Sequence, residues 1–112
     1  MNRTDNYRHM IMGAVPPTRN VFNGEIYGKM SIEYAREAIR KLKDADDAYA
    51  FNLKDDYVRN VNISRDYISA CLEELEKDSQ KCYDTEDKSL LEDSIKVLTS
   101  LDSCLEKIIE EN

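Results

Sequence analysis

The stretch LLEDSIKVLTSLDSCLEKII, residues 90–109, decides the fold. Its apolar residues recur at the spacing that places them on one face of an α-helix. Asp84 or Thr85 lies in position to cap such a helix, and Glu86 and Asp87 complement the dipole of its first turn. The pattern therefore predicts a long amphipathic helix near the C-terminus. Its apolar stripe consists of Leu91, Leu98, Leu101, Leu105 and Ile108, flanked by Leu90, Ile95 and Ile109.

Two further apolar stripes with the same helical period precede this one. The first predicts a helix from about Gly28 to about Phe51, and Asp55 and Asp56 mark the start of the next. Because Asn52 is the only break signal between them, one long bent rod is an alternative. The first stripe contains Ile32, Ala35, Ile39 and Leu42, extended by Ala38, Ala45 and Tyr49, and the second contains Tyr57, Val58, Val61, Ile68, Cys71, Leu72 and Leu75.

Three amphipathic helices can bury their apolar stripes against one another in an antiparallel bundle. The sequence predicts an all-α fold in which residues 27–112 form a small three-helix antiparallel bundle. The length of 112 residues suits a single domain with one core.

The first 26 residues have a different pattern. All glycines and prolines of the chain fall within residues 1–28, and Pro16 and Pro17 forbid a continuous helix there. We therefore expect residues 1–26 to form an extended or irregular N-terminal arm. Its apolar residues are too many for a solvated tail, so the arm should pack on the bundle or on a partner. They are Met10, Ile11, Met12, Val15, Val21 and Phe22.

The composition bears on where the protein works. Hydrophobic residues make up 41% and charged residues 35%, and no run approaches the ~20 apolar residues of a membrane span. The N-terminus lacks the apolar stretch of a secretion signal, and three cysteines are an odd number for a disulfide framework. We expect a cytoplasmic protein that does not associate with membranes.

The net charge of −7 is concentrated near the C-terminus, where residues 83–112 carry nine acids against three lysines. Direct nucleic-acid binding requires a basic surface that neutralises phosphates, which this balance disfavours. A protein partner with a basic or mixed surface fits this charge balance better. A second hypothesis is self-association into a homo-oligomer.

Residues suited to catalysis or metal binding are few. His9 is the only histidine, and no known signature surrounds any cysteine. Cys71 and Cys104 fall on or beside apolar stripes, which predicts small core residues, whereas Cys82 falls in a predicted loop. Glu73 and Glu76 have the spacing of helical metal ligands, but the inward positions beside them are apolar. We expect no enzyme, no metal site and no cofactor.

Seven tyrosines and no tryptophan are consistent with an interaction surface, although most tyrosines are expected at the edge of the core with solvated hydroxyls. The candidate partner-binding residues come from the arm, the first helix and the acidic face of the last helix. They are Met10, Met12, Phe22, Tyr27, Glu92, Glu106 and Glu110.

Three functional hypotheses follow. The first is a non-enzymatic protein-binding module, either an adaptor, a chaperone or an inhibitor, that acts through its arm and its acidic helical face. The second is an acidic nucleic-acid mimic that inhibits a nucleic-acid-binding enzyme, such as a phage anti-defence protein, and the third is a carboxylate-metal hydrolase. In size and architecture, a short arm followed by an acidic bundle resembles small flagellin-type export chaperones and small phage inhibitors of host defence.

Overall fold

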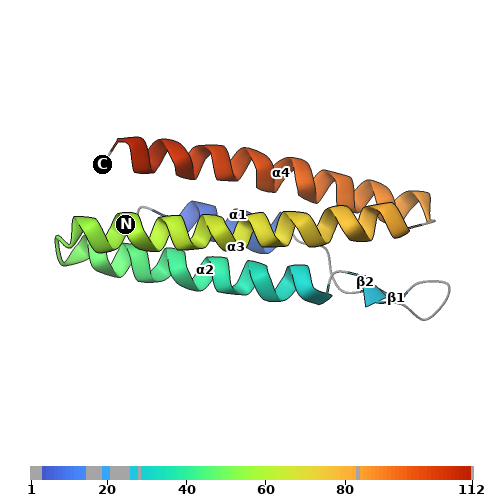
Figure 1. Cartoon of the computed structure of the whole chain (residues 1–112), viewed down its shortest axis with the longest axis horizontal. Helices are drawn as coiled ribbons and strands as arrows, with labels where there is room; N and C mark the ends of the chain where they lie inside the picture. The colour runs from blue at the N-terminus through green and yellow to red at the C-terminus, as the bar shows by residue number, and fades with distance from the viewer. Residues whose placement is uncertain (1–3, 15–18, 21–25, 28, 83, 112) are drawn as a thin grey trace.

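The computed structural model describes residues 4–14, 19–20, 26–27, 29–82 and 84–111. Helices dominate this part of the chain, as predicted (Figure 1). The elements are α1 (Asp5–Ala14), β1 (Arg19–Asn20), β2 (Ile26–Tyr27), α2 (Lys29–Ala50), α3 (Lys54–Lys81) and α4 (Thr85–Glu110). The two short strands pair in antiparallel fashion, with Arg19 opposite Tyr27 and Asn20 opposite Ile26.

The three predicted helices correspond to α2, α3 and α4. Helix α2 begins and ends within one residue of the expected bounds, and Asp55 and Asp56 occupy the first turn of α3. Asp84 caps α4, because its side chain accepts a hydrogen bond of 3.0 Å from the backbone N–H of Asp87. Helices α2 and α3 are separate and antiparallel (Figure 1), so the alternative of one long rod is wrong.

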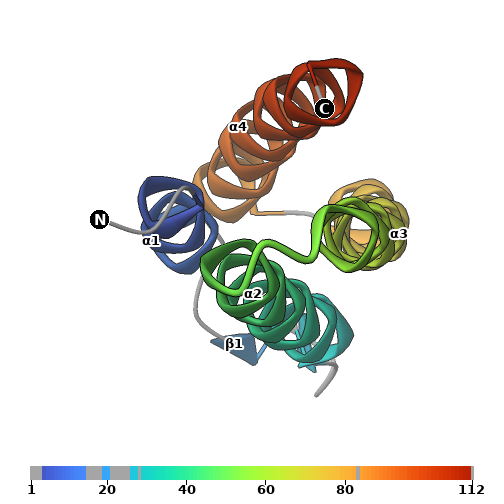
Figure 2. The same cartoon turned by 90° about the vertical axis from the view of Figure 1, so that its left-hand side faces the viewer.

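The prediction of an extended arm is wrong for residues 5–14, which form helix α1. The described chain therefore has four helices instead of three. Seen end-on, α1 lies between α2 and α4, on the side opposite α3 (Figure 2). The prolines directed the prediction toward extended structure, but the helix ends at Ala14, before Pro16. Residues 15–18 and 21–25 lie outside the described part.

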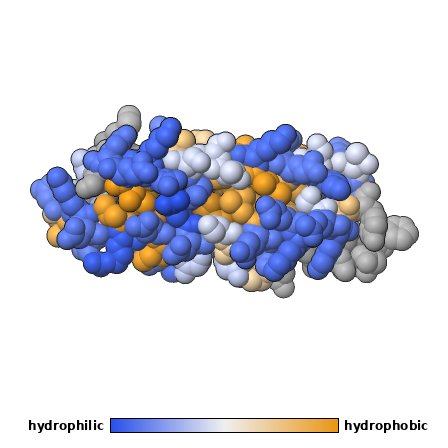
Figure 3. All heavy atoms as spheres, turned by 45° about the horizontal axis from the view of Figure 1, so that its top comes forward, coloured by the Kyte–Doolittle hydropathy of each residue, from blue (hydrophilic) through white to orange (hydrophobic). Residues whose placement is uncertain are grey.

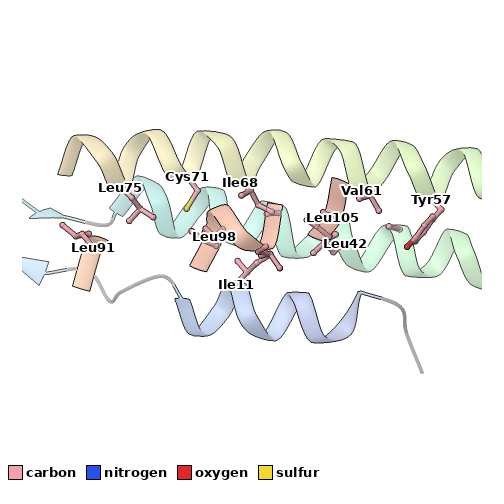
Figure 4. Close-up of a cluster of buried hydrophobic side chains, with 14 of the residues drawn as sticks. Ile11, Leu42, Tyr57, Val61, Ile68, Cys71, Leu75, Leu91, Leu98 and Leu105 are labelled. Atoms are coloured by element: carbon pink, nitrogen blue, oxygen red, sulfur yellow. The ribbon is translucent and has the colours of Figure 1, made fainter. Parts of the chain in front are cut away.

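The core is one continuous cluster contributed by all four helices (Figure 4). Helix α2 contributes mainly small residues, and the hydroxyl of Ser64 on α3 donates a 2.8 Å hydrogen bond to the carbonyl of Ala38 on α2. Small side chains let the two helix backbones approach closely, and such a bond satisfies a buried hydroxyl. Fully buried large residues include Ile11, Leu42, Tyr57, Val61, Ile68, Leu75, Leu98, Leu101 and Leu105.

Candidate protein-binding surfaces

The acidic residues predicted for binding lie on the exposed side of α4. Glu92, Glu106 and Glu110 are all exposed. Glu92 and Glu110 are 18 residues apart, about five helical turns, so they lie on the same line along the helix. Glu106 differs from them because its carboxylate lies 3.8 Å from the guanidinium of Arg65 on α3. Glu92 and Glu110 are therefore better placed than Glu106 to contact a partner.

Arg65 joins α3 to α4 through Asp102. Its Nε and one terminal nitrogen donate hydrogen bonds of 2.9 and 3.3 Å to the two carboxylate oxygens of Asp102. These hydrogen bonds raise the pKa of the Arg65 guanidinium above its ordinary value. The bidentate geometry fixes the relative position of the two helices more firmly than a single contact would.

On the face shown in Figure 3, apolar surface lies between hydrophilic borders.

Helix α1 presents two exposed methionines. Met10 is 44% exposed and Met12 is 66% exposed, whereas Ile11 between them is fully buried. Figure 4 shows Ile11 projecting from α1 into the core cluster. Because successive helical residues are rotated by about 100°, the two methionines lie on opposite flanks of the Ile11 contact. Met10 and Met12 are therefore exposed on different sides of the helix.

The N-terminus of α1 is held by the buried carboxylate of Asp46 on α2. This carboxylate accepts a 3.0 Å hydrogen bond from the backbone N–H of Thr4 and lies 2.6 Å from the Thr4 hydroxyl. Arg8 also donates to Asp46, at 3.3 Å. Buried carboxylates are costly unless they are fully hydrogen-bonded, and these three donors satisfy Asp46. The cluster thereby orients the helix that carries the methionines.

The structure does not gather the predicted site residues on one face. Ser94 marks the side of α4 that faces α1, because its hydroxyl donates a hydrogen bond to the carbonyl oxygen of Ala14. Glu92 is two residues before Ser94, so it points about 160° away from α1 around the helix. Phe22 lies outside the described residues, and Tyr27 is described only through its backbone in β2.

The turn between α2 and α3 lies at the predicted break, but its exposed apolar residues were not among the predicted site residues. Phe51 is the most exposed large apolar residue described, at 76%, and Tyr49 and Leu53 beside it are also exposed. A surface hollow next to the turn is lined by residues 52–56 and Arg59. The helical period could not reveal this exposure, because Phe51 and Leu53 lie beyond Ala50, the last residue of α2, where that period no longer sets which side of the chain is buried.

A line of exposed residues on α4 was also missed. Leu90, Val97 and Cys104 are each exposed and are spaced seven residues apart. The prediction that Cys104 is a core residue is therefore wrong, because it points away from the leucine stripe. The seven-residue spacing places these residues near one line of the helix, but it does not show that the line is exposed, because Leu91, Leu98 and Leu105 have the same spacing and are buried.

The other cysteines and the tyrosines also differ in part from expectation. Cys71 is buried as predicted, and burial raises the pKa of its thiol to about 12. Cys82 is buried although it falls in the connection between α3 and α4. Tyr57 is fully buried in place of lying at the core edge, and its ring packs against that of Tyr49 at a centroid distance of 5.2 Å.

The last features considered in the sequence are His9, a metal site and a membrane span. His9 is exposed, and its imidazole lies 3.8 Å from the carboxylate of Asp5. Within residues 4–14, 19–20, 26–27, 29–82 and 84–111, no group of three or more His, Cys, Asp or Glu side chains is arranged to hold a metal ion. None of the described helices combines the length and apolar character needed to cross a membrane.

Comparison of the chain with protein-family models, curated proteins and solved structures found no match.

Proposed function

We propose that this protein is a non-enzymatic binding module that recognises another protein through helices α1 and α4. The observation that carries the proposal is the row of exposed carboxylates on α4, in a segment where residues 83–112 carry nine acids against three lysines. Such a row attracts a basic surface over a distance of about 8 Å at physiological salt. The exposed methionines of α1 offer flexible apolar contacts on a different face from Glu92 and Glu110, and such contacts suit protein recognition.

The test uses the whole chain to capture its partner from the cell that makes it, followed by association kinetics with the purified partner. Glu92, Glu110 and Glu111 are changed together to Lys, because all three are exposed. Glu106 is left unchanged since its replacement would also disturb Arg65. We expect association at low salt to slow about tenfold or more and to lose its salt dependence.

The matched control is the triple change of Asp66, Glu73 and Glu76 to Lys, which alters the charge of exposed α3 positions by the same amount. This control should slow association much less. Failure to capture any protein, or equal association rates for the parent and the α4 variant, would contradict the proposal.

The same carboxylates support a second candidate, a nucleic-acid mimic that occupies the basic groove of an enzyme. Glu92 and Glu110 repeat on one line of α4, and rows of negative charge can replace phosphates at a basic surface. The two candidates differ in competition. A short DNA or RNA duplex should displace the captured partner from a mimic, whereas it should leave a binding module of the first kind bound.

A further inference from the structure

Three residues of α4 form an apolar line that is exposed in the part of the chain that the structure describes. Leu90 is 38% exposed, Val97 is 39% exposed, and Cys104 is also exposed. At 1.5 Å per residue, the line is about 21 Å long. Spacing of seven residues is the repeat by which one helix packs along another. Its length and spacing therefore match an added helix of about four turns.

Helix α1 forms one border of this line. Ser94 lies between Leu90 and Val97 in the sequence, and its hydrogen bond to the carbonyl oxygen of Ala14 places the C-terminal end of α1 beside them. Met10, one helical turn before Ala14, is 44% exposed. The four residues Met10, Leu90, Val97 and Cys104 are hereafter called the α1–α4 stripe.

Acidic residues border the other side. Glu86 and Asp93 precede Leu90 and Val97 by four residues each, and both are exposed. On the helical wheel they lie beyond the apolar line, about 80 to 100° from Ser94. An occupant of the stripe would therefore meet apolar side chains at its centre and carboxylates along one edge.

We propose that the α1–α4 stripe binds a basic amphipathic helix of a partner protein. The proposal rests on the proposed function and specifies the chemistry of the partner. Apolar residues of the partner helix would pack along the stripe, and Lys or Arg on its flank would pair with Glu86 and Asp93. A second copy of the chain fits less well, because an α4–α4 contact would bring together two segments that each carry nine acids against three lysines.

The test uses a synthetic helical peptide with leucine at every third and fourth position and lysine elsewhere, labelled for fluorescence anisotropy. One control peptide has the same composition in scrambled order, and a second has glutamate in place of lysine. We expect the full chain to bind the first peptide at least tenfold more tightly than either control. Equal binding of the amphipathic and scrambled peptides, or no binding, would overturn the proposal.

Val97→Asp tests the apolar contact. The added acid attracts a basic peptide, so a loss of affinity of about tenfold would identify a lost apolar contact. The control Ser103→Asp adds the same charge to an exposed position of α4, about 120° away around the helix. It should bind at least as tightly as the parent. Circular dichroism verifies that both variants keep their helices, and Leu90→Asp provides a second test of the stripe.

Neighbouring acids separate this proposal from the proposed function. Asp93→Lys changes the border of the stripe, whereas Glu92→Lys makes the same charge change about 100° away. We expect Asp93→Lys to weaken peptide binding at least threefold more than Glu92→Lys. Equal losses would overturn the stripe as the docking site while leaving an acidic α4 surface in place. A parent chain that self-associates, and that Val97→Asp converts to a monomer, would identify a second copy as the occupant and overturn the proposal.

Discussion

Asn52 ends helix α2 in the left-handed conformation, with a φ of 60°. The backbone N–H of Leu53 donates to the carbonyl of Ala48 at 2.9 Å, and the N–H of Asn52 donates to that of Tyr49 at 3.0 Å. These two bonds form a Schellman motif, in which the residue that reverses the chain is usually Gly and sometimes Asn. Asn tolerates this conformation better than other residues with a Cβ atom. Residues 51–53 separate α2 from α3, and the left-handed conformation of Asn52 reverses the chain there.

Replacement of Asn52 should show whether its backbone conformation or its side-chain contacts stabilise the turn. Asn52→Ala is expected to lower the free energy of unfolding by about 1 kcal/mol, because alanine is strained at positive φ. Asn52→Gly should be at least as stable as the parent. Urea denaturation of the three proteins measures the difference. Equal losses in Ala and Gly variants would show that the side chain of Asn52, instead of its backbone conformation, stabilises the turn.

Cys71 and Cys104 should differ in reactivity. A thiol reagent at pH 8 is expected to modify exposed Cys104 rapidly and buried Cys71 only after unfolding, since the Cys71 pKa is about 12. Mass spectrometry of peptides measures the modification of each site. Rapid modification of Cys71 in the folded chain would contradict its burial.

The raised pKa of Cys71 also predicts a pH effect on stability. Above pH 9.0, the ordinary value, the unfolded thiol loses its proton while the folded thiol keeps it. The unfolded state then binds fewer protons, so stability falls as pH rises from 9.0 toward 12. We expect the stability advantage of the parent over Cys71→Ala to shrink by about 1 kcal/mol between pH 8 and pH 10. Denaturation at both pH values measures it, and an unchanged difference would argue against a shifted pKa.

At the scale of elements, α1 depends on contacts with the rest of the chain. A helix of ten residues is marginal in isolation, because nucleation is costly and few hydrogen bonds repay it. Burial of Ile11 and the hydrogen bonds of Thr4 to Asp46 supply the missing stabilisation. Helix α4, by contrast, has a capping residue and a long leucine stripe of its own. The two helices that form the proposed binding surface therefore differ in how they are stabilised.

Removal of the Asp46 carboxylate should release α1. Asp46→Ala leaves the donors of buried Thr4 and partly buried Arg8 without this acceptor, and we expect a loss of about 2 to 3 kcal/mol. Tryptic cleavage after Arg8 should accelerate while α2, α3 and α4 remain protected. The control Asp47→Ala changes the exposed neighbour and should alter neither property. Unchanged cleavage in Asp46→Ala would show that Ile11 alone holds the helix.

The leucine stripe of α4 can be tested with adjacent residues. Leu98→Ala and Leu105→Ala should each cost about 2 to 5 kcal/mol, because both side chains are fully buried. Val97→Ala, one residue away and partly exposed, should cost less than about 1 kcal/mol. Thermal unfolding compares the three variants. If the parent and both leucine variants melt at similar temperatures, the leucine stripe does not form the buried side of α4.

The whole molecule is elongated, with extents of 50 × 21 × 20 Å and a Cα radius of gyration of 15.0 Å. A rounder domain of this length would have a radius of gyration of about 13 Å. The elongation follows from the long antiparallel helices (Figure 1). Because the core between them is small, much of the helical surface is exposed. The elongation also keeps the exposed residues of the α2–α3 turn apart from the proposed binding surface of α1 and α4.

The sequence by itself determined α2, α3 and α4, because each has an apolar stripe long enough to express the helical period and Asp84 provides a cap for the last. It also placed the acidic residues on the outer side of α4, since charge and period are both local properties.

Only the tertiary structure decided the helical state of residues 5–14, the burial of Cys82 and the exposure of Cys104. It also decided that Ser94 borders α1, which separates Glu92 from the methionine-bearing helix. These features depend on which residues meet across the core. Local periodicity specifies which side of a helix is apolar, but the partner that covers that side comes from distant parts of the chain, as Asp46 does for Thr4.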